Sequence, residues 1–328
     1  MRLILTICLA LLGTHATAQD MRTYVDDLGT SVEIPVQPQR IVSLRGEQFT
    51  APLWELGAPI VGSSGRTDDV INNGEPYVRG AFDLFNLTFE NSGITWIGSP
   101  NNPDFEAIVA LQPDLILIPH WQEDIQDQLS QIAPTVVIAI QPNPMLERYR
   151  KVADVAGMLD RFESFMPAYE AKLAVARNVI ADTIGDPSDV SVVIAEVWKD
   201  DGGLVVFQDY AAMSQVLRDL GFAMPDFVAA LEETFANISP EILPQIDADF
   251  MIGTYNFAFG EPPSQRVAEW EALIPVWDEV LHAPANNQHF FIDRETMRAL
   301  SFRSLETTLA IFVSQIATRD FVPLAKAE

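Results

Sequence analysis

The sequence predicts an α/β protein of two lobes, each with a mainly parallel sheet flanked by helices, joined by one long helix. Short apolar segments alternate with helical patterns along the chain, which is typical of βαβ units. A long apolar stripe of helical period lies near the middle of the chain, with similar strand-and-helix patterns on both sides of it. Two short sequence pieces also recur in both halves. Together these observations favour two related lobes.

The segment from Asp160 to Ile184 is predicted to be the connecting helix. Its apolar side chains recur every three or four residues and so share one helix face: Phe162, Met166, Tyr169, Leu173, Ala176, Ile180 and Ile184. Asp160 and Glu163 are predicted as an N-cap and its capping-box partner. Pro167 is expected to kink the first turns. A long helix within one domain is the alternative, and the repeat described below favours the connector.

Residues 1–18 are predicted to be a cleaved secretory signal. Arg2 precedes an apolar run at residues 3–12, and Ala16-Thr17-Ala18 matches a cleavage site. Ten apolar residues are too few to span a bilayer, which argues against an anchor. Cys8 is the only cysteine and lies inside this run, so lipid attachment and disulfides are not expected. We expect a soluble periplasmic monomer.

The chain is strongly acidic, with 46 acidic and 20 basic residues and a formal charge of -26. Loss of Arg2 with the signal leaves 19 basic residues and a charge of -27, the difference between 19 and 46. Such a field repels nucleic acid and anionic membranes, so neither is expected as a partner. An anionic ligand would require basic side chains gathered in one place, which makes the few arginines informative.

The N-terminal lobe is predicted at residues 19–144. It begins with a hairpin or extended lead-in at residues 21–36, followed by strands at 41–44, 59–62, 95–98, 115–118 and 135–140 and helices at 48–56, 104–111 and 125–132. Gly57 is placed to end the first of these helices. Residues 63–93 are predicted to be an irregular insertion, and a loop of this length is usually functional or disordered.

Connecting helices are predicted at residues 145–186, and the C-terminal lobe at residues 187–328. Its predicted strands are 190–197, 204–207, 250–254 and 289–292, and its helices are 213–220, 239–246, 267–273, 276–281 and 303–318. Residues 198–203 and 255–264 are predicted to be loops that follow strands.

The repeat has two parts. Residues 53–57 match residues 217–221, and each piece would be a helix ended by glycine. Glu106 and Asp114 match Glu241 and Asp249, with a spacing of eight residues in each pair. Each half would then carry a glutamate near a helix start and an aspartate that opens a buried strand. The alternative is chance, because glutamate favours helix N-termini in general.

A ligand site is predicted in a cleft between the lobes, because ligands of open parallel sheets bind beyond the carboxyl ends of the strands. Arginine forks bind anionic oxygens, and aromatic rings supply flat apolar walls. The candidates are Arg45, Arg66, Arg298 and Arg303 for oxygens, and Trp121, Trp198, Tyr210 and Tyr255 for walls. For any one arginine, a structural salt bridge is the alternative. The set suits a bulky anionic molecule with flat or apolar parts.

At several stretches the sequence resembles the periplasmic substrate-binding proteins of iron-siderophore ABC transporters, a family that includes cobalamin and haem binders. The similar stretches are Asp27-Leu28-Gly29, Pro38-Gln39-Arg40-Ile41-Val42-Ser43-Leu44, Phe105-Glu106-Ala107-Ile108-Val109-Ala110-Leu111-Gln112-Pro113-Asp114-Leu115-Ile116, Ile238-Ser239-Pro240-Glu241, Trp270, Trp277, Ala283 and Phe291-Ile292-Asp293. The resemblance covers nearly all of the exported chain, but residues 63–93 are hard to match.

The resemblance implies two α/β lobes bridged by a long helix, with only small closure on binding. It also implies a ferric siderophore as ligand, with the iron held by the siderophore, no cofactor and no direct metal ligand from the protein. Glu106 and Glu241 would dock onto arginines of an inner-membrane permease. Their matching positions suit a two-fold partner read by charge pairing.

The sequence leaves three alternative functions open. A receptor for haem or cobalamin would fit the same family. An exported two-domain α/β enzyme is the alternative of another class, but the chain lacks G-x-S-x-G, H-E-x-x-H, Walker A and G-x-G-x-x-G motifs. A receptor for free metal is weakly supported, because the histidines after the signal, His120, His282 and His289, are widely spaced.

Overall fold

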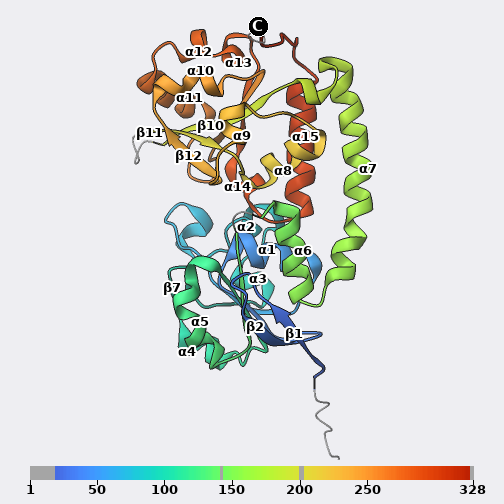
Figure 1. The fold of residues 1–328 in the computed structure, drawn as a ribbon. Coiled ribbons are helices and arrows are strands. Elements are labelled where there is room, and N and C mark those ends of the chain that lie inside the picture. Colours follow the sequence, from blue (N-terminus) through green and yellow to red (C-terminus); the bar gives the residue numbers. More distant parts are fainter. Residues whose placement is uncertain (1–18, 141–142, 199–202, 326–328) are drawn as a thin grey trace, which may run out of the picture.

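The computed structural model describes residues 19–140, 143–198 and 203–325, so the predicted signal lies outside the described residues. Two five-stranded sheets form the centres of two lobes stacked end to end, as predicted (Figure 1). Helix α7 (Leu159–Ile184) runs along one side of the molecule from the first lobe to the second (Figure 1). The exact lobe boundaries, at residues 144 and 187, stay a prediction.

The N-terminal sheet is entirely parallel, with the order β5-β4-β3-β8-β9. Its strands are β3 (Ile41–Ser43), β4 (Ile60–Ser63), β5 (Thr95–Trp96), β8 (Leu115–Pro119) and β9 (Thr135–Ile138). A hairpin of β1 (Met21–Val25) and β2 (Ser31–Pro35) precedes it, as predicted, and β6 (Gly98–Ser99) pairs with β7 (Asn102–Pro103). Its helices include α1 (Ala51–Leu56), α4 (Phe105–Ala110), η3 (His120–Ile125) and α5 (Gln126–Ser130).

One predicted helix of this lobe differs from the structure in its first three residues. The segment predicted as a single helix at residues 48–56 is a π-helical turn, η1 (Gly46–Thr50), followed by α1. The wider turn begins directly after Arg45, and it buries Glu47 and Phe49. This placement brings the Glu47 carboxylate into the junction between the lobes. Hydrophobic periodicity in the sequence could not indicate that position.

The C-terminal sheet is mixed, with the order β12-β11-β10-β13-β14. Its strands are β10 (Val192–Trp198), β11 (Gly203–Phe207), β12 (Phe235–Ile238), β13 (Phe250–Tyr255) and β14 (His289–Asp293). Strands β10, β13 and β14 are parallel, whereas β11 is antiparallel to β10 and β12. Strand β12 is absent from the sequence expectation, because this short edge strand is only half-buried. Trp198 was predicted in a loop, but it is the last residue of β10.

Helices surround this second sheet. They are α8 (Ala211–Leu220), α9 (Asp226–Ala229), η5 (Pro240–Ile242), α10 (Leu243–Ile246), α11 (Pro263–Leu273), α12 (Trp277–Val280), α13 (His282–Ala285), α14 (Arg294–Arg298) and α15 (Phe302–Ile316). The helix predicted at residues 239–246 is therefore divided into η5 and α10, since Pro240 and Pro244 lack the backbone N–H that a continuous helix needs. Helix α15 packs against α7 and α8.

The apolar stripe of α7 faces the core, as predicted. Phe162, Tyr169 and Ile180 are buried, and Met166 and Leu173 pack partly buried against the same cluster. That cluster continues through α6 (Met145–Val155) and α15 into both sheets, so apolar packing joins the lobes.

The predicted cap of α7 is wrong. The helix begins at Leu159, and the residue before it, Met158, makes no side-chain cap hydrogen bond. Asp160 is already inside the first turn and is exposed, so its carboxylate can act only on the helix dipole. Pro167 lies inside the helix, which continues past it to Ile184.

The repeated residues have matching structural roles. Gly57 and Gly221 end α1 and α8 in the left-handed region, with φ of 77° and 96°. The Asp114 carboxylate accepts hydrogen bonds from the backbone of residues 39 and 40 at 2.7 and 2.8 Å, just before β3. Asp249 accepts one from the backbone N–H of Ser191 at 2.7 Å, just before β10. Each aspartate therefore fixes the entry to the central strand of its sheet.

The segment predicted as an irregular insertion, residues 63–93, is more ordered than expected. It contains η2 (Ile71–Gly74), α2 (Ala81–Phe85) and α3 (Phe89–Ser92). Val78, Ala81 and Leu87 form a small core that includes Ala299 of the other lobe. The insertion therefore contributes to the junction between the lobes.

Within the ranges that the structure describes, no helix combines the length and the apolar character needed to cross a bilayer.

Replacing Asp249 with alanine should destabilise the protein by about 3 kcal/mol. The buried carboxylate accepts hydrogen bonds from Ser191 and from the backbone N–H of Leu324, and their loss leaves buried donors unpaired. Asp160→Ala is the matched control and should cost less than about 1 kcal/mol, because it removes only a helix-dipole interaction. Urea unfolding of both variants measures the difference, and equal losses would contradict these roles.

Candidate functional site

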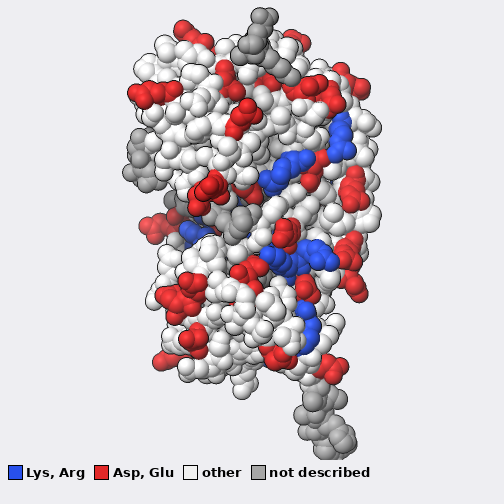
Figure 2. Space-filling view, viewed as in Figure 1, with Lys and Arg blue, Asp and Glu red and all other residues white. Residues whose placement is uncertain are grey.

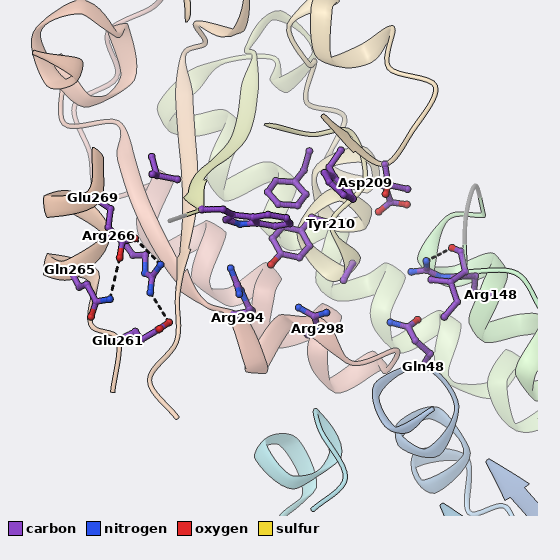
Figure 3. A pocket seen from close by; sticks show the side chains of 17 residues that line it. Gln48, Arg148, Asp209, Tyr210, Glu261, Gln265, Arg266, Glu269, Arg294 and Arg298 are labelled. Atoms are coloured by element: carbon purple, nitrogen blue, oxygen red, sulfur yellow. Dashed lines mark hydrogen bonds and ion pairs between the residues drawn. The ribbon is translucent and has the colours of Figure 1, made fainter. Parts of the chain in front are cut away.

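A cavity of about 630 Å³ opens between the lobes (Figure 3). Most of its lining comes from the C-terminal lobe, from β10, β11, β12, α11 and α14. Gln48 and Ile140 contribute from the N-terminal lobe, and Arg148 contributes from α6. The cavity is thus built where both lobes meet the connecting helices, as the predicted cleft required.

One wall of the cavity is aromatic. Phe207 and Tyr210 stack with ring centroids 4.1 Å apart, and Trp198 lies 5.5 Å from Phe235 and 5.9 Å from Phe207. The Trp198 indole N–H donates to Glu196 at 2.8 Å, which fixes the plane of the ring. Burial raises the pKa of the Tyr210 hydroxyl, so this ring stays neutral. The wall therefore offers a flat, rigid apolar surface.

Arginines of the C-terminal lobe line the cavity beside the aromatic wall (Figure 3). Arg294 opens α14 and pairs with Glu196 at 2.6 Å, and Arg298 ends the same helix. Arg266 lies between Glu261 and Glu269, at 2.6 and 2.7 Å.

Arg148 enters from α6 and donates to the backbone carbonyl of Ile140 at 2.5 Å. Burial lowers the pKa of Arg148, and the nearby carboxylate of Asp209 opposes that shift.

The centre of the junction is the carboxylate of Glu47. It is buried and pairs with Arg45 at 2.8 Å. Burial alone would raise the pKa of Glu47, but nearby guanidinium groups hold it at about 2. They belong to Arg45, Arg298, Arg79 and Arg66. We call these four residues, together with Arg294, the arginine cluster.

The arginine cluster also links the two lobes directly. Arg79 donates to both carboxylate oxygens of Glu295 on α14, at 2.8 and 2.5 Å. The backbone carbonyl of Glu47 accepts from Leu300 at 2.9 Å. Arg45 lies over the ring of Trp121, with 5.4 Å to the ring centroid. Positive charge is therefore concentrated at the junction of a chain that is acidic elsewhere.

The structure brings six of the eight predicted ligand residues to this region. Trp198, Tyr210 and Arg298 line the cavity. Arg45 and Arg66 meet Arg298 around Glu47, and Trp121 lies against Arg45.

The other two predicted residues lie outside the cavity lining. Tyr255 ends β13. Arg303 donates to the carbonyl of Leu84 at 2.5 Å and lies over the ring of Phe85, so it joins α15 to α2 instead.

Several lining residues were missed by the sequence reasoning. Arg294 directly follows β14, in the same segment from which Arg298 was chosen, so the rule that selected Arg298 covers it as well. Arg148 and Arg266 lie within helices, where no sequence signal separates a cavity arginine from a surface one. Phe235 belongs to the edge strand that was not predicted.

The two predicted docking glutamates are exposed on different lobes. Glu106 lies in the first turn of α4, and Glu241 lies in η5. On the face drawn in Figure 2, acidic side chains are scattered over both lobes, and the few basic ones lie mostly near the junction and beside α7.

Within the described ranges, no three His, Cys, Asp or Glu side chains gather in a way that could hold a metal ion.

The chain is similar to known proteins in both sequence and fold. A family model described as periplasmic binding protein matches residues 70–294. The chain is 30% identical over 269 residues to the iron(3+)-hydroxamate-binding protein YxeB of Bacillus subtilis. The matched region covers 80% of this chain and 76% of the relative.

The fold is similar to that of Staphylococcus aureus SirA, solved with staphyloferrin B. The TM-score is 0.73 and the identity 20%, over 90% of this chain and 98% of that one. The FhuD protein from S. pseudintermedius gives a TM-score of 0.71 and an identity of 22%, over 92% and 99% of the chains. These likenesses confirm the predicted two-lobe fold with its long connecting helix.

Replacing Glu47 with glutamine should destabilise the protein by about 3 kcal/mol at pH 7, because the surrounding arginines lose a buried partner. The folded-state pKa of Glu47 lies below its usual 4.5, at about 2. Its stabilising effect is therefore complete above pH 4.5 and is lost as the pH falls toward 2. Urea unfolding at several pH values should show the gap between wild type and variant shrinking over this window.

The exposed Glu90→Gln variant is the control and should track the wild type at every pH. A gap between the wild type and Glu47→Gln that stays constant from pH 4.5 to 2 would contradict the assignment of charge to Glu47.

Proposed function

The chain belongs to the periplasmic binding protein family, and from this premise we propose that it captures a ferric siderophore and delivers it to an inner-membrane ABC permease. Membership of this family makes the chain a binding protein rather than an enzyme. We further propose that it acts as a monomer in the periplasm after removal of residues 1–18. The iron is cargo and is held by the siderophore.

The single observation that carries this proposal is one inter-lobe cavity that combines an aromatic wall with Arg294 and Arg298, while the rest of the arginine cluster lies around Glu47 nearby. Siderophores combine apolar linkers with oxygen-rich iron-binding groups. The stacked rings of Phe207 and Tyr210 suit the apolar linkers, and guanidinium donors suit the oxygen-rich groups. A volume of about 630 Å³ lies in the range of ordinary small-molecule sites.

The relatives support the same ligand class. YxeB is named as an iron(3+)-hydroxamate-binding protein, and SirA was solved with staphyloferrin B. A receptor for haem or cobalamin remains the alternative within the family, because a flat macrocycle could also lie against the aromatic wall. The same ligand panel distinguishes these possibilities.

Docking to the permease is proposed to use Glu106 and Glu241. Both are exposed, and they come from the repeated piece of each lobe, so they would present two similar charges to a two-fold partner. Charge pairing of this kind affects association more than ligand affinity.

A panel of ferric hydroxamates, catecholates and citrates, with haem and cobalamin, tests the proposed ligand by quenching of intrinsic tryptophan fluorescence. At least one ferric siderophore should bind with saturable quenching. Trp198→Phe should keep the aromatic wall and lose the largest share of the quenching, because Trp198 lines the cavity. Trp54→Phe, on α1 and outside the cavity lining, is the matched control. Binding of haem or cobalamin alone, or of nothing in the panel, would overturn the proposal.

The docking proposal is tested with the double variant Glu106→Gln, Glu241→Gln. Its affinity for the ferric ligand should equal that of the wild type, whereas iron uptake should fall at least tenfold in cells that depend on this protein. Glu90→Gln with Glu271→Gln removes two other exposed charges, one per lobe, and should leave uptake unchanged. Equal uptake by both double variants would refute the docking role.

A further inference from the structure

The arginines of the cavity and the junction between the lobes differ in whether they have an ion-pair partner. Arg45 is paired with Glu47, Arg79 with Glu295 and Arg294 with Glu196. Arg266 has Glu261 and Glu269 as partners. Each of these arginines therefore has at least one carboxylate partner of its own. Their charges are compensated without any ligand.

Two arginines of the cluster lack such a partner. Within the described residues, neither Arg66 nor Arg298 makes an ion pair or a side-chain hydrogen bond. The Nε atom of each is buried and has no hydrogen-bond acceptor. The nearby carboxylate, Glu47, already pairs with Arg45. Arg298 lines the cavity, and Arg66 lies near it beside Glu47. Unpaired buried donors and charges are costly, so these two arginines point to a missing anionic partner.

The two arginines without an ion-pair partner come from different lobes. Arg66 follows β4 in the N-terminal lobe, and Arg298 ends α14 in the C-terminal lobe. Burial lowers the pKa of Arg66, and the negative charge of Glu47 opposes that shift. Three neighbouring arginines, including Arg298, lower the pKa of Arg66 further. The two guanidinium groups therefore repel each other across the junction. An anion placed between the lobes would relieve that repulsion on both sides.

We propose that this site selects ferric complexes that present at least two negative charges, such as carboxylate or catecholate complexes, over neutral or cationic trihydroxamates. Arg66 and Arg298 would each hold one anionic group and so couple the lobes through the ligand. The proposal rests on the proposed function and names the class of siderophore. It also separates this chain from YxeB, the relative named for iron(3+)-hydroxamate binding.

Charge complementarity explains the expected preference. Carbonyl oxygens of a neutral complex can accept hydrogen bonds but leave both guanidinium charges without counter-ions. Carboxylate or catecholate oxygens satisfy the donors and the charges together. Each charge-assisted pair lost should weaken binding roughly tenfold to hundredfold.

The test compares anionic ferric citrate and ferric enterobactin with cationic ferrioxamine B by fluorescence titration of the full chain. The wild type should bind an anionic complex at least tenfold more tightly than ferrioxamine B. Arg66→Gln and Arg298→Gln should each weaken anionic binding by tenfold or more and leave ferrioxamine B unaffected. Arg161→Gln is the control, since Arg161 is exposed on α7 and lies over Phe165. It changes the net charge equally and should leave all affinities unchanged.

A measurement on the wild type keeps the test independent of how the variants fold. Raising the salt concentration should weaken anionic binding and leave ferrioxamine B binding nearly constant or stronger. If ferrioxamine B binds as tightly as the anions, or Arg66→Gln and Arg298→Gln match Arg161→Gln, the charge selection is wrong while siderophore capture stands. If no ferric complex binds, the proposed function fails and this inference with it.

Discussion

The buried carboxylate of Glu47 is the interaction on which the junction between the lobes depends. Four guanidinium groups surround it, and their like charges could not be gathered in a buried place without a counter-charge. Its side chain pairs with Arg45, while its backbone carbonyl accepts a hydrogen bond from Leu300 of the other lobe. One residue thus holds positive side chains together and also joins the lobes. The chain as a whole carries a charge of -26. The positive character of the site therefore depends on this local gathering of arginines.

Further contacts across the junction limit how the lobes can move. Glu55 on α1 accepts hydrogen bonds from the backbone N–H groups of Phe302 and Arg303 at 2.7 and 3.0 Å, and from the Tyr149 hydroxyl at 2.7 Å. This carboxylate of one lobe therefore caps the first turn of α15 in the other. Together with the apolar cluster that runs through α6, α7 and α15, it ties the two lobes to each other. The small closure that the sequence resemblance implies stays a prediction.

Much of the fold was predictable because local signals and tertiary packing agree. The stripe on α7, the glycines after α1 and α8, and the Asp114–Asp249 correspondence all depend on backbone geometry that periodicity and turn chemistry encode. The predicted cap of α7 is wrong because Asp160 lies two residues after the N-cap position, Met158, and so is already within the helix. Strand β12 was missed because its pairing with β11 is a long-range contact with little burial.

The site was predictable only in part, since the position after a strand selects loops but not the direction of side chains. This rule found Arg45, Arg66 and Arg298, and it also selected Arg303, which turns instead toward α2. Nothing in the sequence indicated that Glu47 is buried. The most direct test of the account is the position of iron in crystals grown with a ferric siderophore, located by anomalous scattering. We predict one iron atom in the inter-lobe cavity, between the aromatic wall and the arginine cluster. Iron bound elsewhere on the protein, with this cavity empty, would contradict the account.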